Sequence, residues 1–123
     1  MKLLLDSHIP PAVARELGRQ CRGLEAVHLR DWHQGRFRNS PDPDLIDAAS
    51  GEGLTLATYD LRTIPRLLRR LAAEGKHHAG VVLIDDATVP SSDVGGLVAA
   101  LAALWRAHGK ENWRDRCQFV RRQ

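Results

Sequence analysis

Met1-Lys2-Leu3-Leu4-Leu5-Asp6 opens the chain with a short apolar run that an aspartate ends. The leucines show no helical period, and so short an apolar run is typical of a strand buried on both faces of a parallel sheet. In an open parallel sheet, ligands bind outside the carboxyl ends of the strands, where Asp6 would lie. This stretch therefore predicts an α/β fold and one residue of its site.

The rest of the chain alternates further apolar runs with helix signals. Strands are expected at residues 24–29, 54–58, 81–84 and 118–120, and helices after Pro10, from the segment Ser40 to Asp44, after Pro65 and over residues 94–108. Such alternation implies a mostly parallel sheet covered on both faces. We therefore expect a three-layer α/β/α fold with a central sheet of four to five strands.

The size of the chain favours a single domain spanning residues 1–123, because 123 residues with 43% apolar content can bury a core. No run approaches the roughly 18 apolar residues of a membrane span, and Asp6 ends the first run too early for a signal peptide. Cys21 and Cys117 have no spacing typical of a disulfide framework or a zinc site. We expect a cytoplasmic protein that does not engage membranes.

Arginine dominates the basic residues of this chain, whose net charge is +3. Arginines gather in three segments, residues 30–38, 62–70 and 114–122. Arginine is suited to bidentate phosphate contacts, so the segments favour nucleic acid, although solvated helix faces explain them equally well.

Aspartates follow two of the expected strands and begin one of the helices. Asp60 comes just after residues 54–58, and Asp42 and Asp44 lie in the first turn of the second helix. Either of the latter two could simply cap that helix. If they converge with Asp6 and Asp60, their mutual repulsion calls for a cation, and oxygen ligands select Mg²⁺ or Mn²⁺. Such a site suits phosphodiester hydrolysis.

Several blocks of the chain together resemble a known family. They are residues 3–10 (LLLDSHIP), 42–49 (DPDLIDAA), 56–60 (LATYD), 80–84 (GVVLI) and 96–105. In these blocks the chain resembles the compact bacterial PIN-like proteins, which are similar in fold to toxin ribonucleases of the PIN superfamily. The resemblance implies a metal-dependent endoribonuclease, often encoded beside a small antitoxin, with Asp6, Asp60 and Asp42 or Asp44 as catalytic metal ligands.

Two positions depart from the family pattern. Ser7 stands where many relatives have a second acidic residue, and Arg62 stands where many have a further aspartate. A catalytically weak binding module that acts through a protein partner is therefore an alternative. A phospho-receiver domain is another, but it needs an acidic pair after the first strand and a lysine after the fifth, and the C-terminal region offers only Lys110.

Side chains near the expected site are candidates for binding RNA. Arg62, and then Arg36 or Arg38, are expected to hold the phosphate backbone, with Ser7 and His8 also placed to touch substrate. Trp32 is a candidate for stacking on bases, and the Asp85-Asp86 pair for an outer acid of the site. The oligomeric state stays open, with a homodimer as one option.

Overall fold

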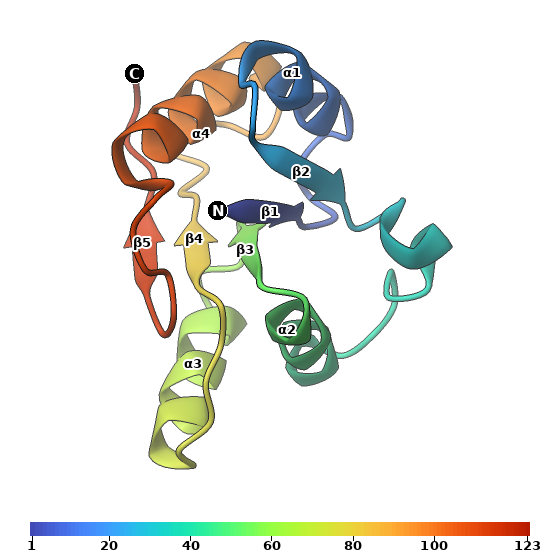
Figure 1. Ribbon diagram of the computed structural model, residues 1–123, viewed down its shortest axis with the longest axis vertical. Helices are drawn as coiled ribbons and strands as arrows, with labels where there is room; N and C mark the ends of the chain where they lie inside the picture. Colours follow the sequence, from blue (N-terminus) through green and yellow to red (C-terminus); the bar gives the residue numbers. More distant parts are fainter.

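The computed structural model describes residues 1–123 as a five-stranded, all-parallel sheet with strand order β2-β1-β3-β4-β5 (Figure 1). The strands are β1 Lys2–Leu5, β2 Glu25–His28, β3 Leu54–Thr58, β4 Val81–Leu83 and β5 Cys117–Phe119. The helices are α1 Ala12–Gln20, α2 Asp42–Gly51, α3 Thr63–Ala73 and α4 Val94–His108, with a short 3-10 helix η1 at Trp32–Gly35.

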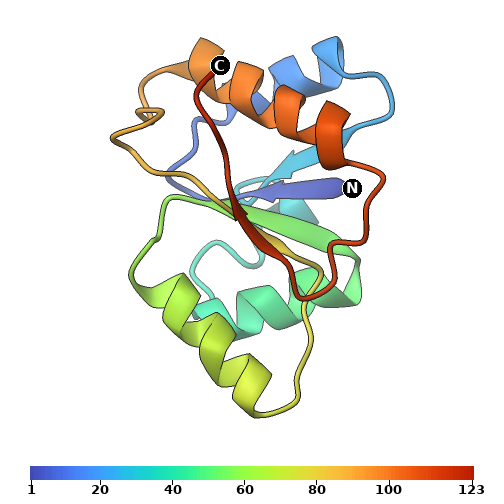
Figure 2. The ribbon, with the colours of Figure 1, turned by 90° about the vertical axis from the view of Figure 1, so that its left-hand side faces the viewer.

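Helices cover both faces of the sheet, as the sequence predicted. Figure 2 shows α1 and α4 on one side and α2 and α3 on the other. The α/β prediction is confirmed, and the sheet is entirely rather than mostly parallel. No helix combines the length and the hydrophobicity that a membrane crossing requires.

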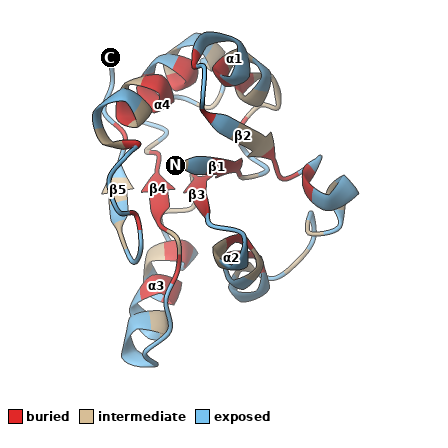
Figure 3. Cartoon of the chain, viewed as in Figure 1, coloured by how far each residue is buried: buried red, intermediate tan, exposed pale blue.

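The apolar run of β1 supplies side chains to both halves of the core. Leu3 and Leu5 belong to the cluster beneath α1 and α4, whereas Leu4 belongs to the cluster formed with α2 and α3. Successive side chains of a strand point to opposite faces, so a strand buried on both must be apolar throughout. Figure 3 shows this burial in β4, in contrast to β5 at the edge.

The helix α3 begins two residues before the proline that was expected to open it. Its first residue is Thr63, and Pro65 lies in the first turn. A proline is tolerated there because the amide groups of the first turn have no partner within the helix.

The prediction that Trp32 stacks on bases is wrong. Its side chain is only 5% exposed and stacks on Phe37 with ring centroids 4.8 Å apart. Its indole N–H also donates to a carboxylate oxygen of Glu52 at 3.3 Å. The aromatic pair in this arginine-rich loop therefore packs into the core below it, because burying both rings stabilises the fold more than exposing them.

Candidate active site

The carboxylate of Asp6 is fixed at the carboxyl end of β1. The Asp6 backbone N–H donates to the Ala57 carbonyl at 3.0 Å, which extends the pairing of β1 with β3 past the strand end. One carboxylate oxygen accepts from the Thr58 hydroxyl at 2.7 Å, and the other from the Ser7 backbone N–H at 2.8 Å. Asp6 is thus oriented by the last buried residue of the neighbouring strand.

Asp60 is tied to the same hydroxyl and to the start of α3. Its backbone N–H donates to the Thr58 hydroxyl at 3.0 Å. Its carboxylate accepts from the backbone N–H groups of Arg62 and Thr63, at 3.0 and 2.8 Å, and from the Thr63 hydroxyl. Burial opposes its ionisation, but the hydrogen bonds from Thr63 and Arg62 prevail and lower the Asp60 pKa.

Asp42 begins α2, and its carboxylate accepts no hydrogen bond within the protein. Burial raises the pKa of Asp42, and the negative charges of Asp60 and Asp6 raise it further. Carboxylates disfavour each other's ionisation in this way only when they are near one another. Asp42 therefore lies within the electrostatic reach of both strand-end aspartates.

These three aspartates line one pocket of about 490 Å³. Asp86 lines it as well, and its carboxylate accepts from the Ser91 backbone N–H at 3.0 Å. The remaining polar side chains of the lining are Ser7, His8, Arg38, Ser40, Tyr59 and Ser91.

Not every residue that the sequence suggested lies at this pocket. Asp44 is exposed and outside the lining, which leaves Asp42 as the acid that α2 contributes. Of the expected RNA contacts, Ser7, His8 and Arg38 line the pocket, whereas Arg36 and Arg62 are exposed and do not.

The pocket offers a cation three carboxylates from three separate elements. Asp6, Asp42 and Asp60 form no ion pair with any arginine, lysine or histidine. Carboxylate oxygens are the ligands of hard ions such as Mg²⁺ and Mn²⁺, so the donor chemistry fits such an ion. In this conformation no three potential ligands in the chain are close enough together to hold a metal ion.

Two residues of the site, both in the 56–60 block, were not singled out from the sequence as site residues. Thr58 is completely buried, and its hydroxyl joins Asp6 to Asp60, but in the sequence it looks like any strand residue. Tyr59 lines the pocket and donates its hydroxyl to the Val89 carbonyl at 2.7 Å. Burial, with the charges of Asp86 and Asp93, raises the pKa of Tyr59 to about 12, so it stays neutral and serves as a hydrogen-bond donor.

In a comparison with known protein families, residues 1–86 match the family model described as a PIN-like domain. This range includes β1 to β4 and every aspartate that lines the pocket, and excludes α4 and β5. No curated protein and no solved structure matches the chain. Because the family model spans well over half of the 123 residues, the chain belongs to the PIN-like domain family.

Proposed function

We propose that this protein is a metal-dependent endoribonuclease that hydrolyses RNA phosphodiesters with Mg²⁺ or Mn²⁺ at Asp6, Asp42 and Asp60. The observation that carries the proposal is that these three carboxylates share one pocket and have no cationic partner. PIN-like domains are commonly nucleases, which agrees with this chemistry.

The residues of the site divide into fixed and adjustable ligands. Hydrogen bonds hold Asp6 and Asp60 in place, whereas the Asp42 carboxylate is free to move toward an ion. When bound, the ion would supply a water of lowered pKa for attack on phosphorus and neutralise charge on the phosphate. Arg38, with Ser7 and His8 beside it, would hold the RNA backbone at the pocket rim.

The biological role that we propose is the toxin half of a toxin–antitoxin pair. RNA would be the substrate, and a small antitoxin-type protein the partner that restrains cleavage. This role rests on the family resemblance, to which the pocket adds three carboxylates that form no ion pair.

The test is cleavage of a structured RNA in Mg²⁺ or Mn²⁺, with EDTA as the metal-free arm. We expect Asp6→Asn to abolish cleavage, because the substitution keeps the side-chain shape and removes a charge that holds the ion. Asp47→Asn is the matched control, since Asp47 is exposed on α2 and lies outside the pocket. Equal cleavage by Asp6→Asn and the parent would refute the proposal.

A catalytically weak binding module is the second candidate, and two features favour it. No three ligands are preassembled in this conformation, and Ser7 and Arg62 replace acids common in the family. Absence of metal-dependent cleavage of any RNA, together with intact folding, would favour this candidate.

A phospho-receiver role has less support, although the strand order is one that receivers share. Both carboxylate oxygens of Asp60, the residue after β3, already accept hydrogen bonds from the start of α3. A phosphoryl acceptor must instead present a free oxygen. Labelling of Asp60 by acetyl phosphate would revive this alternative.

A further inference from the structure

The outer edge of β5 presents free backbone groups. In the sheet order, β5 is the last strand and has β4 as its single neighbour. The Arg116 carbonyl accepts from Val81 at 2.9 Å, and the Val120 N–H donates to Leu83 at 3.0 Å. Backbone groups of successive strand residues point to opposite sides, so those of Cys117 and Phe119 point away from the sheet.

This edge is also apolar. Phe119 is 51% exposed and is the single large hydrophobic side chain exposed on the protein. Beside it, a hollow of about 330 Å³ runs between β5 and α4. Its apolar wall is formed mainly by Ala100, Ala103, Leu104 and Ala107. An exposed aromatic side chain next to an apolar hollow is typical of an interaction surface.

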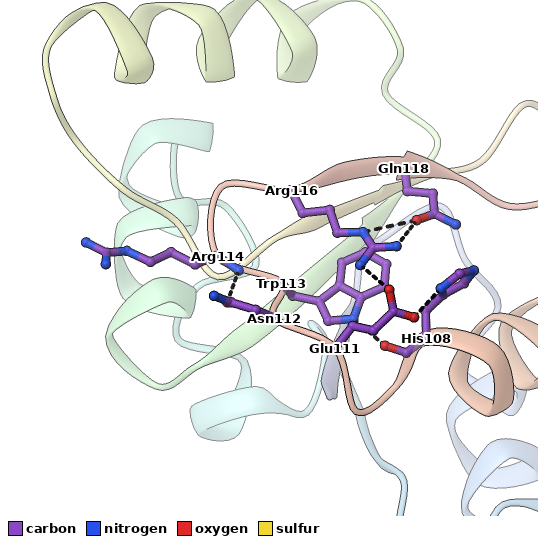
Figure 4. A network of polar contacts seen from close by, with 7 residues as sticks. All are labelled: His108, Glu111, Asn112, Trp113, Arg114, Arg116 and Gln118. Carbon is purple, nitrogen blue, oxygen red and sulfur yellow. Dashed lines mark hydrogen bonds and ion pairs between the residues drawn. The ribbon is translucent and has the colours of Figure 1, made fainter.

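Side-chain contacts order the segment that leads from the end of α4 into β5, without any bound partner. The Arg116 guanidinium lies 4.4 Å from the centroid of the Trp113 ring and donates to Glu111 at 3.0 Å and to Gln118 at 2.7 Å (Figure 4). The Trp113 indole N–H donates to the His108 carbonyl at 2.9 Å. A segment that is already ordered loses little conformational entropy on binding.

Unpaired charge at this edge is positive. Arg121 and Arg122, which follow β5, are exposed and form no ion pair. The nearby carboxylates are already engaged, Glu111 by Arg116 and His108, and Asp115 by His77. Pairing β5 with β5 of a second copy would bring these arginines together, so self-association is disfavoured.

We propose that β5 binds an extended, acidic segment of a partner protein, which adds to the sheet as a sixth strand. Its backbone pairs with the outward groups of Cys117 and Phe119, its apolar side chains cover Phe119 and the alanine-lined hollow, and its carboxylates meet Arg121 and Arg122. RNA would use the arginines and leave the outward N–H groups unpaired. The surface lies outside the residues that match the family model, so it goes beyond the proposed nuclease activity.

The test uses the full chain and a synthetic peptide in which glutamate and valine alternate. We expect saturable binding, with slower amide exchange at Cys117 and Phe119 and no change at Gln118, which already faces β4. A lysine–valine peptide and an RNA oligonucleotide are the comparison probes. The proposal is overturned if the acidic peptide does not bind, or if either comparison probe gives the same protection. It is also overturned if protection rises with protein concentration alone.

Matched variants separate the contributions to binding. Phe119→Ala removes the ring, whereas Phe119→Pro removes both the ring and the outward N–H without touching the bonds to β4, so it should bind the peptide more weakly than Phe119→Ala. The double change Arg121→Glu, Arg122→Glu should weaken binding by at least about fivefold. The equivalent double change at Arg15 and Arg22, exposed near α1, is the charge-matched control. Equal weakening by the two double variants would contradict an acidic strand at β5.

Discussion

Acidic side chains have ion-pair partners at the amino ends of the parallel strands and none in the pocket at the carboxyl ends. At the amino ends of β4 and β5, Glu111 and Asp115 are paired. Hydrogen bonds from Arg116 and then His108 lower the pKa of Glu111, and those from His77 and then His78 lower the pKa of Asp115. At the carboxyl ends, Asp6, Asp42 and Asp60 share a pocket, and none of them forms an ion pair.

This contrast separates charges that stabilise the fold from charges that are candidates for a functional site. The paired acids at the amino end contribute to the fold, because each gains a partner in the native state. At the carboxyl end, burial and like charges raise the pKa of Asp42, a cost that folding alone does not require. Side chains held at such a cost are candidates for a site that a cation completes.

The largest effect on RNA cleavage is expected from substituting one of the two aspartates in the first turn of α2. Asp42→Asn should reduce RNA cleavage by on the order of 100-fold or more, because it removes a ligand inside the pocket. Asp44→Asn should cleave within about threefold of the parent, since a first-turn acid outside the pocket acts mainly on the helix dipole. Single-turnover cleavage in Mn²⁺ measures both. If the order were reversed, Asp44 and not Asp42 would be the ligand.

Two buried threonines at opposite ends of β3 sharpen the comparison. Thr58→Val removes the hydroxyl that joins Asp6 and Asp60, so activity and Mn²⁺ affinity should fall by roughly 10- to 100-fold. Thr55→Val removes a bond to the Ala79 carbonyl, 2.8 Å long, at the amino end.

Thr55→Val should cost about 1 kcal/mol in the free energy of unfolding, because one hydrogen bond is lost, and Thr58→Val about 2 to 3 kcal/mol, because two are lost, one of them to the Asp6 carboxylate. Titration calorimetry should therefore show a loss of Mn²⁺ affinity in Thr58→Val alone, whereas urea denaturation should show a loss of stability in both variants. A parallel loss of Mn²⁺ affinity in Thr55→Val would mean that the two ends are not functionally separate.

A smaller effect is expected at the arginines. Arg38 lines the pocket, so Arg38→Ala should weaken RNA binding severalfold. Binding should also become less sensitive to salt, because the slope of log affinity against log salt concentration should fall by about one phosphate contact. Arg62→Ala should weaken RNA binding less than Arg38→Ala, and Arg36→Ala should weaken it least. Neither the Arg62 nor the Arg36 side chain lines the pocket. Binding to catalytically inactive Asp6→Asn at several salt concentrations gives the slopes. Salt-independent affinity would exclude backbone contacts by all three.

The smallest effect concerns stability against pH in the absence of metal. The Asp42 pKa is raised above 3.8 on folding, so its contribution to stability is full below pH 3.8 and is lost as pH rises through the raised value. Asp42→Asn should therefore gain stability relative to the parent as pH rises through this range.

Asp115→Asn should behave in the opposite sense. The Asp115 pKa is lowered below 3.8 on folding, so its stabilisation is present above pH 3.8 and is lost as pH falls through the lowered value. The variant should be less stable than the parent near neutral pH and match it in strong acid. Urea denaturation of both variants at several pH values, in EDTA, measures the pair. If the stability of both variants relative to the parent changed in the same direction with pH, the two ends of the strands would not differ in this way.

Much of the fold could be predicted because local patterns determine it. Apolar runs such as Leu3 to Leu5, the proline and aspartate at the start of α2 and the regular alternation of elements all act within a few residues. Element boundaries moved by one to three residues, as for α3, because helix ends depend on which first-turn groups find partners.

The sequence by itself determined that aspartates follow β1 and β3 and begin α2, and that the sheet is mostly parallel. Only the tertiary structure decided which acids line one pocket, because this depends on β1 lying beside β3 and on the side of α2 that faces the strand ends. That placement selects Asp42 over Asp44, buries Trp32 and makes Thr58 the link between two acids. Helical residues two positions apart face different directions, and side chains from distant segments meet only after packing, so no local pattern encodes these choices.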